Sequence, residues 1–191
     1  STFKIRIISN KDSFTHQLIQ YYSKQKSPLK LAPKEEWIEK VLAVEHFKSN
    51  SLETRFSVMV DWGKDAGLRA HEICALNIDQ IPARDEIEKS LIAKENIYIV
   101  LNVTKGMKKS TIPVSPDLLK KTRDYMDFER KEIIKKFREK SQLTRKAYSP
   151  PQEVFLSLKT GQALHPRTLS NQIRTGWCQA VKDGELTEDQ H

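Results

Sequence analysis

The sequence has few of the residues that build metal centres and disulfide-bonded scaffolds. Its 191 residues include two cysteines, Cys74 and Cys178, which lie far apart and outside any Cys-x-x-Cys or Cys/His cluster. The five histidines show no metal-ligand spacing either. We therefore expect two reduced, partly buried thiols and no zinc site.

Long apolar runs are also absent. No stretch approaches the ~18 consecutive apolar residues that cross a membrane, and the first residues lack the basic and apolar regions of a secretory signal. The content of 38% hydrophobic and 30% charged residues is typical of a globular protein. Because the sequence does not begin with Met, we expect a portion of a longer protein.

The net charge of +8 is concentrated in one segment. Residues 105–146 hold fourteen Lys or Arg and six Asp or Glu, whereas the rest of the chain has nineteen of each sign. A basic surface of this kind suits a polyanion, of which DNA and RNA are the usual examples. The alternative is a solvated helix in which Glu129, Glu132 and Glu139 pair with neighbouring bases. Charge alone does not separate the two.

Composition divides the chain into a lead-in and a main domain. Residues 1–30 are mixed and favour one helix around 14–24. The two prolines and four lysines of residues 24–35 indicate a linker or turn. We place the start of the main domain near Leu31.

Apolar periodicity predicts three helices at the start of this domain. The first begins after Pro33, the second spans roughly 52–64 and the third runs through 69–76. Gly67 ends or kinks the second helix, and the acidic, mixed residues 77–95 predict a loop or an extension. The expected apolar faces carry Trp37, Val41, Val44, Phe56, Met59, Val60, Ile73 and Leu76.

The remainder predicts a small sheet between helices. Residues 97–114 read as a β-hairpin around a glycine-containing turn. Ser115 begins a long helix that runs to about Lys140, residues 154–158 form a short strand, and Pro166 starts a last helix. The order predicts an α+β fold, mostly helical with a small antiparallel β-sheet. The expected buried stripes of the two helices are Leu118, Leu119, Thr122, Tyr125, Met126, Ile133, Phe137, Leu169, Ile173, Trp177 and Val181.

An arginine directly after Gly-Leu, at the predicted start of a helix, can carry chemistry. Glu72 lies three residues after Arg69, on the same helix face, so its carboxylate can hold the guanidinium or a neighbouring loop in place. A guanidinium fixed in this way presents a planar donor fork that matches a phosphate. The alternative is an ordinary surface ion pair, which contributes little to stability.

A lysine in the hairpin turn is the second such candidate. Lys105, beside Gly106, can reach into a groove, and it can donate a proton to a leaving oxygen if its pKa is lowered. The alternative is an exposed turn lysine without a chemical role.

Three segments, taken in order, resemble the tyrosine recombinase (phage integrase) family. GLRAHEICALNIDQI (67–81) is similar to the family's first conserved box, a Gly-Leu-Arg with a Glu three residues after the Arg. IVLNVTKGMKKSTIPVSPDLL (99–119) is similar to its β-hairpin, and EVFLSLKTGQALHPRTLSNQIRTGW (153–177) to the next segment. The resemblance covers about Leu31 to Trp177 and implies a partial recombinase catalytic domain over residues 31–191.

The resemblance implies a role for each matching residue. Arg69 corresponds to the first catalytic arginine, which binds the scissile phosphate and stabilises its transition state. Glu72 corresponds to the acidic residue that supports the site, and Lys105 to the lysine that protonates the departing 5′ oxygen. The family uses no metal and no nucleotide cofactor, and its tyrosine forms a phosphotyrosyl intermediate. The implied protein is a cytoplasmic site-specific recombinase of bacterial or phage origin. It acts on double-stranded DNA, as a tetramer when full-length, and needs no membrane.

Two parts of the family pattern are missing from the 191 residues. No His-x-x-Arg sequence occurs, and His191 is either a loop histidine or the first residue of that box. The five tyrosines all precede the expected position of the nucleophile, and we expect Tyr98 and Tyr125 in the core. We therefore expect these residues to bind duplex DNA weakly without cleaving it. The family's N-terminal core-binding domain is absent or represented only by residues 1–30.

Further DNA contacts are expected on the hairpin and at the start of the last helix. The alternative for each is a surface residue on an amphipathic element. These candidates are Lys108, Lys109, Arg167, Thr168, Asn171 and Arg174.

Two other hypotheses for the whole chain remain open. One is a non-catalytic DNA-binding module, and the other is a helical interaction domain whose basic helix binds an acidic partner. DNA binding through several phosphates weakens steeply with salt, which separates DNA binding from the last hypothesis. A His-x-x-Arg and a Tyr encoded after His191 would favour the enzyme over the module.

Overall fold

The computed structural model divides the chain into two units, Ser1–Lys34 and Glu35–His191. The helix expected around residues 14–24 lies outside the described residues, and the domain start near Leu31 stays a prediction. The structure describes residues 33–43, 50–102, 110–145 and 147–187.

The three helices predicted at the start of the domain are present. They are α1 (Glu35–Ala43), α2 (Asn50–Asp65) and α3 (Ala70–Cys74). Acidic residues in the first turn of each helix complement its dipole. The expected inward residues Val41, Phe56, Met59, Ile73 and Leu76 are buried.

The prediction of a loop or an extension over residues 77–95 is wrong. This segment forms a 3₁₀ turn, η1 (Ile78–Gln80), and a helix, α4 (Arg84–Ala93). The acidic composition that suggested a loop includes two first-turn carboxylates of α4, where they stabilise a helix N-terminus. Ile87 is buried in the core, and α4 packs against α5 (Pro116–Asp127).

The predicted hairpin is a two-stranded antiparallel sheet of β1 (Ile97–Leu101) and β2 (Ser110–Val114). Ile99 faces the core, whereas Tyr98 is 70% exposed. The expectation of a buried Tyr98 is wrong because neighbouring residues of a strand point to opposite faces, and β1 covers the core with Ile99 and Leu101.

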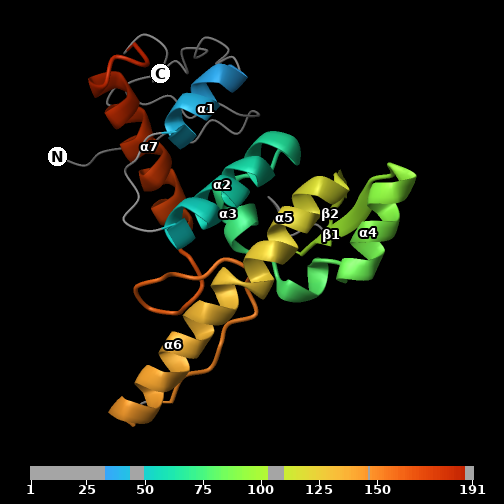
Figure 1. The fold of residues 1–191 in the computed structure, drawn as a ribbon, viewed down its shortest axis with the longest axis vertical. Coiled ribbons are helices and arrows are strands. Elements are labelled where there is room, and N and C mark those ends of the chain that lie inside the picture. Colours follow the sequence, from blue (N-terminus) through green and yellow to red (C-terminus); the bar gives the residue numbers. More distant parts are fainter. Residues whose placement is uncertain (1–32, 44–49, 103–109, 146, 188–191) are drawn as a thin grey trace, which may run out of the picture. The chain divides into compact units, whose positions relative to one another are not determined.

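The long helix predicted from Ser115 is two helices. Ser115 caps α5, and its Oγ accepts a hydrogen bond from the Leu118 amide at 3.3 Å. Phe128, with φ −109° and ψ −80°, breaks the helical path. The second helix, α6 (Glu129–Thr144), then continues beyond the end of α5 (Figure 1). The whole expected stripe from Leu118 to Phe137 is buried, so the apolar periodicity holds across the break.

The strand predicted over residues 154–158 is not formed. Only isolated bridges join Asn77 to Glu153 and Leu156 to Ala163 in the described part of this segment. Residues 154–156 are nevertheless buried completely, because the segment crosses the core and the Val154 amide donates to the Leu76 carbonyl at 2.8 Å. The apolar run of residues 154–158 therefore correctly indicated a buried segment, but the prediction that this segment pairs as a strand was wrong.

The last predicted helix is α7 (Pro166–Lys182). Leu169 is buried as expected, and Trp177 and Val181 pack against the core while partly exposed. Ile173 is 42% exposed, which contradicts its place in the predicted stripe. Ala180 is buried instead, so the inward face of α7 is rotated from the one predicted by the large apolar residues.

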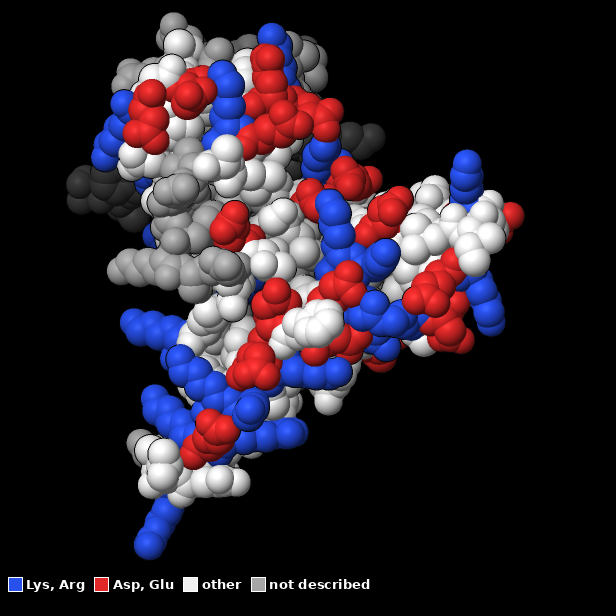
Figure 2. Space-filling view, in the orientation of Figure 1, with Lys and Arg blue, Asp and Glu red and all other residues white. Residues whose placement is uncertain are grey.

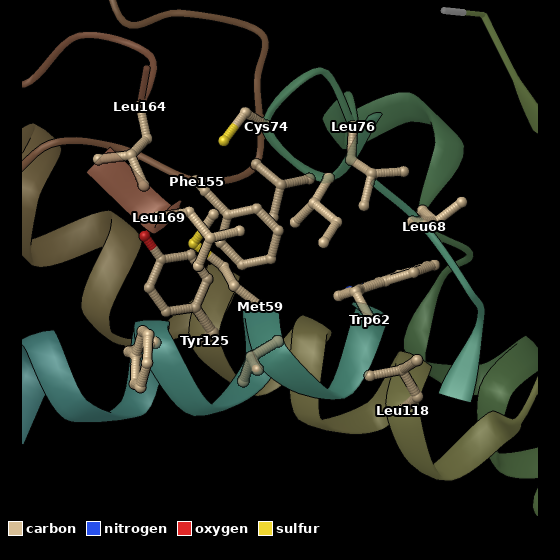
Figure 3. Packing of buried hydrophobic residues seen from close by; sticks show 14 of the residues in the cluster. Met59, Trp62, Leu68, Cys74, Leu76, Leu118, Tyr125, Phe155, Leu164 and Leu169 are labelled. Carbon is tan, nitrogen blue, oxygen red and sulfur yellow. The ribbon is translucent and has the colours of Figure 1, made fainter. Parts of the chain in front are cut away.

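One hydrophobic core joins these elements. Helix α2 lies beside α3, α5 and α7, and its Trp62 donates a hydrogen bond to Thr122 of α5 at 3.0 Å. Phe155 lies among residues of α2, α3 and α7 in the same core (Figure 3). The predicted fold class, mostly helical with a small antiparallel sheet, is confirmed.

Candidate functional site

The start of α3 presents Arg69 at the surface. Gly67 has a φ of +68°, a left-handed conformation that favours glycine. This turn places the Leu68 side chain in the core. The Leu68 amide donates a hydrogen bond to the Trp62 carbonyl in the last turn of α2. Arg69 follows in an extended conformation as the N-cap of α3. Its side chain therefore leaves the core just where the helix begins.

Glu72 is a buried carboxylate that binds the same helix start. Its side chain is 7% exposed, and Oε2 accepts a hydrogen bond from the Arg69 amide at 2.8 Å. Oε1 lies 3.6 Å from the Arg69 guanidinium. One carboxylate thus caps a free backbone N–H of α3 and attracts the arginine side chain above it.

The Arg69 guanidinium keeps its donors available. Its side chain is 63% exposed, and the contact with Glu72 is longer than a hydrogen bond. His71, also exposed, lies 3.9 Å from the same carboxylate oxygen. The arrangement is an anchored, solvent-facing cation, which can bind an anionic oxygen without first breaking a tight ion pair.

The candidate residues at the start of α7 share a surface. Arg167, Asn171 and Arg174 are exposed, and their spacing puts them on one helix face, while Thr168 is half-buried. The first-turn amides are already engaged. Nδ1 of His165 accepts from the Arg167 amide at 3.2 Å, and the His165 carbonyl accepts from the Thr168 amide at 2.8 Å. An anion here would therefore depend on side chains rather than on the helix N-terminus that the sequence suggested.

Helices α3 and α7 pack against one another. Cys74 of α3 and Leu169 of α7 belong to the same core cluster (Figure 3). The fold therefore brings together the two elements that carry Arg69 and Arg167. The other candidates, Lys105, Lys108 and Lys109, lie outside the described residues, in the connection between β1 and β2.

Sequence reasoning missed Arg55, which the fold buries almost completely at 2% exposure. Its Nη1 donates to the Leu156 carbonyl at 2.7 Å, and its Nε has no hydrogen-bond partner. Burial lowers the pKa of this guanidinium, with the nearby Tyr125 acting in the opposite direction. The available signal was helical spacing, because Arg55 shares the inward face of α2 with Met59 and Trp62.

Metal clusters and membrane-spanning helices are absent from the part of the chain that the structure describes. Among these residues, no group of three or more His, Cys, Asp or Glu side chains could hold a metal ion. Within the same ranges, no helix is long and apolar enough to span a membrane.

Comparison with known proteins finds likeness in structure rather than in sequence. No protein-family model and no curated protein sequence matches the chain. The fold is similar to that of the XerA recombinase crystal structure, with a TM-score of 0.50 and 16% identity. The match covers 83% of this chain and 44% of XerA, so the chain spans less than half of that protein's length. At this identity, the comparison shows a shared fold.

Proposed function

We propose that these residues are the DNA-binding portion of a site-specific recombinase of the tyrosine type. The observation that carries the proposal is the Arg69–Glu72 pair, an exposed guanidinium anchored by a buried carboxylate at the start of α3. The similarity of the fold to a recombinase over 83% of the chain supports it. Arg69 binds the scissile phosphate, and Glu72 positions Arg69.

The remaining candidates extend the same site. Lys105 protonates the departing 5′ oxygen, and its neighbours Lys108 and Lys109 contact the DNA backbone. On α7, the exposed face contacts phosphate through Arg167 and Arg174, with Thr168 and Asn171 beside them. The full-length protein acts in the cytoplasm and assembles as a tetramer on DNA. The covalent step is not assigned to any tyrosine of this chain.

The phosphate role of Arg69 is tested by Arg69→Gln in the 191-residue chain. Fluorescence anisotropy with a labelled duplex measures the affinity and its dependence on salt. Loss of one phosphate contact should weaken binding roughly tenfold at 0.1 M salt and reduce the slope of log K against log salt by ~0.9. Unchanged affinity and slope would contradict the role of Arg69.

The role of Glu72 is tested by a double-mutant cycle with Arg69. Glu72→Gln keeps an oxygen that can accept from the Arg69 amide, so α3 should still form. Relative to Glu88→Gln, which removes the same charge from an exposed position on α4, it should weaken DNA binding when Arg69 is present. In the Arg69→Gln background, the two carboxylate substitutions should have equal effects. Equal effects in both backgrounds would show that Glu72 only stabilises the fold.

A helical interaction domain with an acidic partner stays the second candidate. The surface of α6 favours this function, because Lys and Arg predominate there (Figure 2). It predicts that duplex DNA binds no better than an acidic polypeptide.

A further inference from the structure

Helix α6 carries a straight row of basic side chains. Lys131, Lys135 and Arg138, here called the basic stripe, follow one another at intervals of four and three residues, and the polar Gln142 continues the line by one further turn. At ~100° and ~1.5 Å per residue these four side chains stay within one narrow sector and extend for about 16 Å. All four are exposed at the surface, and Figure 2 shows blue side chains gathered along this helix.

Carboxylates do not pair with the centre of the stripe. Glu132 projects roughly a quarter turn away from Lys131 around the helix axis, whereas Glu139 follows Lys135 by four residues and lines the same surface hollow. Lys131 pairs with Asp127 at 3.1 Å, at the end nearest α5. Within the described residues, no carboxylate lies within 4.0 Å of Lys135 or Arg138. The interleaved acids that the sequence offered as partners therefore do not neutralise the centre of the stripe.

The opposite side of α6 is anchored, so the stripe must face outward. Ile133 and Phe137 pack with Leu156 in a separate small cluster. Arg130 donates from Nη2 to the Pro151 carbonyl at 2.6 Å and from Nε to the Glu153 carbonyl at 3.2 Å. These contacts fix the rotation of the helix about its own axis and leave the stripe to solvent.

Like charges three and four residues apart, such as Lys131, Lys135 and Arg138, repel one another and destabilise a helix slightly. A partner that carries negative charge removes this repulsion. Beside the stripe, the aliphatic Ile134 is half-buried against the Ile133 and Phe137 cluster rather than offered as an exposed apolar anchor of the kind that protein–protein interfaces use. The DNA backbone, by contrast, offers closely spaced phosphates without a need for apolar contact.

We propose that the basic stripe of α6 contacts the phosphate backbone of double-stranded DNA. The inference rests on the proposed DNA-binding function and adds a second contact surface, separate from Arg69. It assigns Lys135 and Arg138 as the central contacts. The stripe supplies affinity and orientation without reading base sequence.

The test is Lys135→Gln with Arg138→Gln in the 191-residue chain. The matched control is Lys89→Gln with Lys182→Gln, which removes two charges from helical surface positions outside the stripe. If both stripe residues contact phosphates, the slope of log K against log salt falls by ~1.8, and affinity at 0.1 M salt falls more than tenfold. Glutamine is a good helix former, and relief of repulsion should leave the melting temperature equal to or above that of the unsubstituted chain.

The outcomes separate this inference from the proposed function. Loss of affinity and slope in the stripe variant alone supports the contact. In another outcome, the affinity of the unsubstituted chain for duplex DNA falls steeply as salt rises, and the stripe variant shows the same affinity and salt dependence. The stripe inference is then overturned and the proposed function stands. If the stripe and control variants lose DNA affinity equally, the loss follows from net charge alone, and the stripe inference is overturned as well. Absence of any salt-dependent DNA binding would overturn both.

An acidic protein partner is tested in the same experiment with polyglutamate as competitor. If the stripe binds DNA, polyglutamate should displace the duplex only when its carboxylate groups far outnumber the phosphate groups of the DNA. If polyglutamate binds as tightly as the duplex and the stripe variant loses both, the stripe binds acidic polypeptides and the DNA inference is wrong.

Discussion

Arg55 and Arg130 are both buried, and the hydrogen bonds of both end on backbone carbonyls. Their acceptors lie in one segment, residues 151–156, which crosses the core without forming a strand. Burial lowers the pKa of each guanidinium, because the charged form loses water. Tyr125 completes the arrangement by accepting from the Leu156 amide at 3.3 Å. Side chains thus satisfy backbone groups that a sheet would otherwise pair.

The two cysteines should differ sharply in reactivity. Cys74 is buried and Cys178 is exposed, and desolvation raises the pKa of Cys74 to about 11. At pH 8 the Cys74 thiol is therefore protonated and shielded, so a thiol-specific dye should label one cysteine of the folded protein and both after denaturation. In Cys178→Ser, labelling of the folded protein should disappear. Rapid labelling of that variant at pH 8 would show that Cys74 is accessible.

The raised pKa of Cys74 has a consequence for stability at alkaline pH. Between the ordinary value of 9.0 and about 11, the thiol of the unfolded chain ionises while that of the folded chain keeps its proton. The unfolded state then binds fewer protons, so this contribution to stability falls as pH rises through the window.

At the scale of elements, α6 is held by the turn that precedes α7. Gly161 has a φ of +70°, and a Cβ at this position would lie 2.6 Å from the ring of Phe137. Tyr148 donates to the Gly161 carbonyl at 2.9 Å, and its ring lies 5.6 Å from that of Phe137. The absence of a side chain at Gly161 therefore lets the turn close over α6.

Gly161→Ala should destabilise the protein by two effects. The left-handed backbone conformation is unfavourable for alanine and should lower the free energy of unfolding by ~1–2 kcal/mol. Overpacking against the Phe137 ring should lower it by a further ~1–3 kcal/mol. Gly184→Ala is the matched control, because Gly184 has a φ of +76° with open space at its Cβ. Urea unfolding should give a larger loss for Gly161→Ala. Equal losses would show that Phe137 moves aside at no cost.

At the scale of the whole molecule, two of the three tyrosines that lie within the described residues are held in the fold. Tyr125 is buried, and Tyr148 is engaged with the Gly161 carbonyl. Tyr98 is exposed on β1, and Tyr21 and Tyr22 lie outside the described residues. Under the proposed function, we therefore expect these 191 residues to bind DNA without forming a covalent link to it.

Incubation of the 191-residue chain with end-labelled duplex DNA should yield no adduct that survives denaturing electrophoresis. The reason is that a phosphotyrosyl bond requires an activated tyrosine beside the bound phosphate. An adduct would contradict this expectation. Loss of that adduct in Tyr98→Phe would then identify the exposed tyrosine as the nucleophile.

Local signals predicted most helix starts and the hairpin. Ser115 and Pro116 marked the start of α5, and Gly67 marked the end of α2, because caps and left-handed residues act on their immediate neighbours. The break at Phe128 was missed because the apolar stripe continues in phase across it. The helix over 84–93 was missed because its acidic residues were taken for loop composition.

In the candidate site, too, local sequence predicted some features and the packing of distant elements set the others. The spacing of Arg69 and Glu72 predicted their contact, since residues three apart share a helix face. The burial of Glu72 and the outward exposure of Arg69 depend on how α2, α3 and α7 pack, which no local pattern contains. Engagement of the α7 amides by His165 likewise follows from side-chain geometry.

By itself, the sequence determined the fold class and the charge: a mostly helical chain with one hairpin, an Arg–Glu pair at a helix start and a basic excess in residues 105–146. Periodicity and capping operate over a few residues, so they can be read from the chain. Only the tertiary structure decided what each buried face packs against and, in α7, that Ala180 rather than Ile173 points inward. Contacts between distant residues, such as Arg130 with the Pro151 and Glu153 carbonyls and Phe137 with Gly161, set the rotation of α6. That rotation is what leaves Lys135 and Arg138 aligned toward solvent.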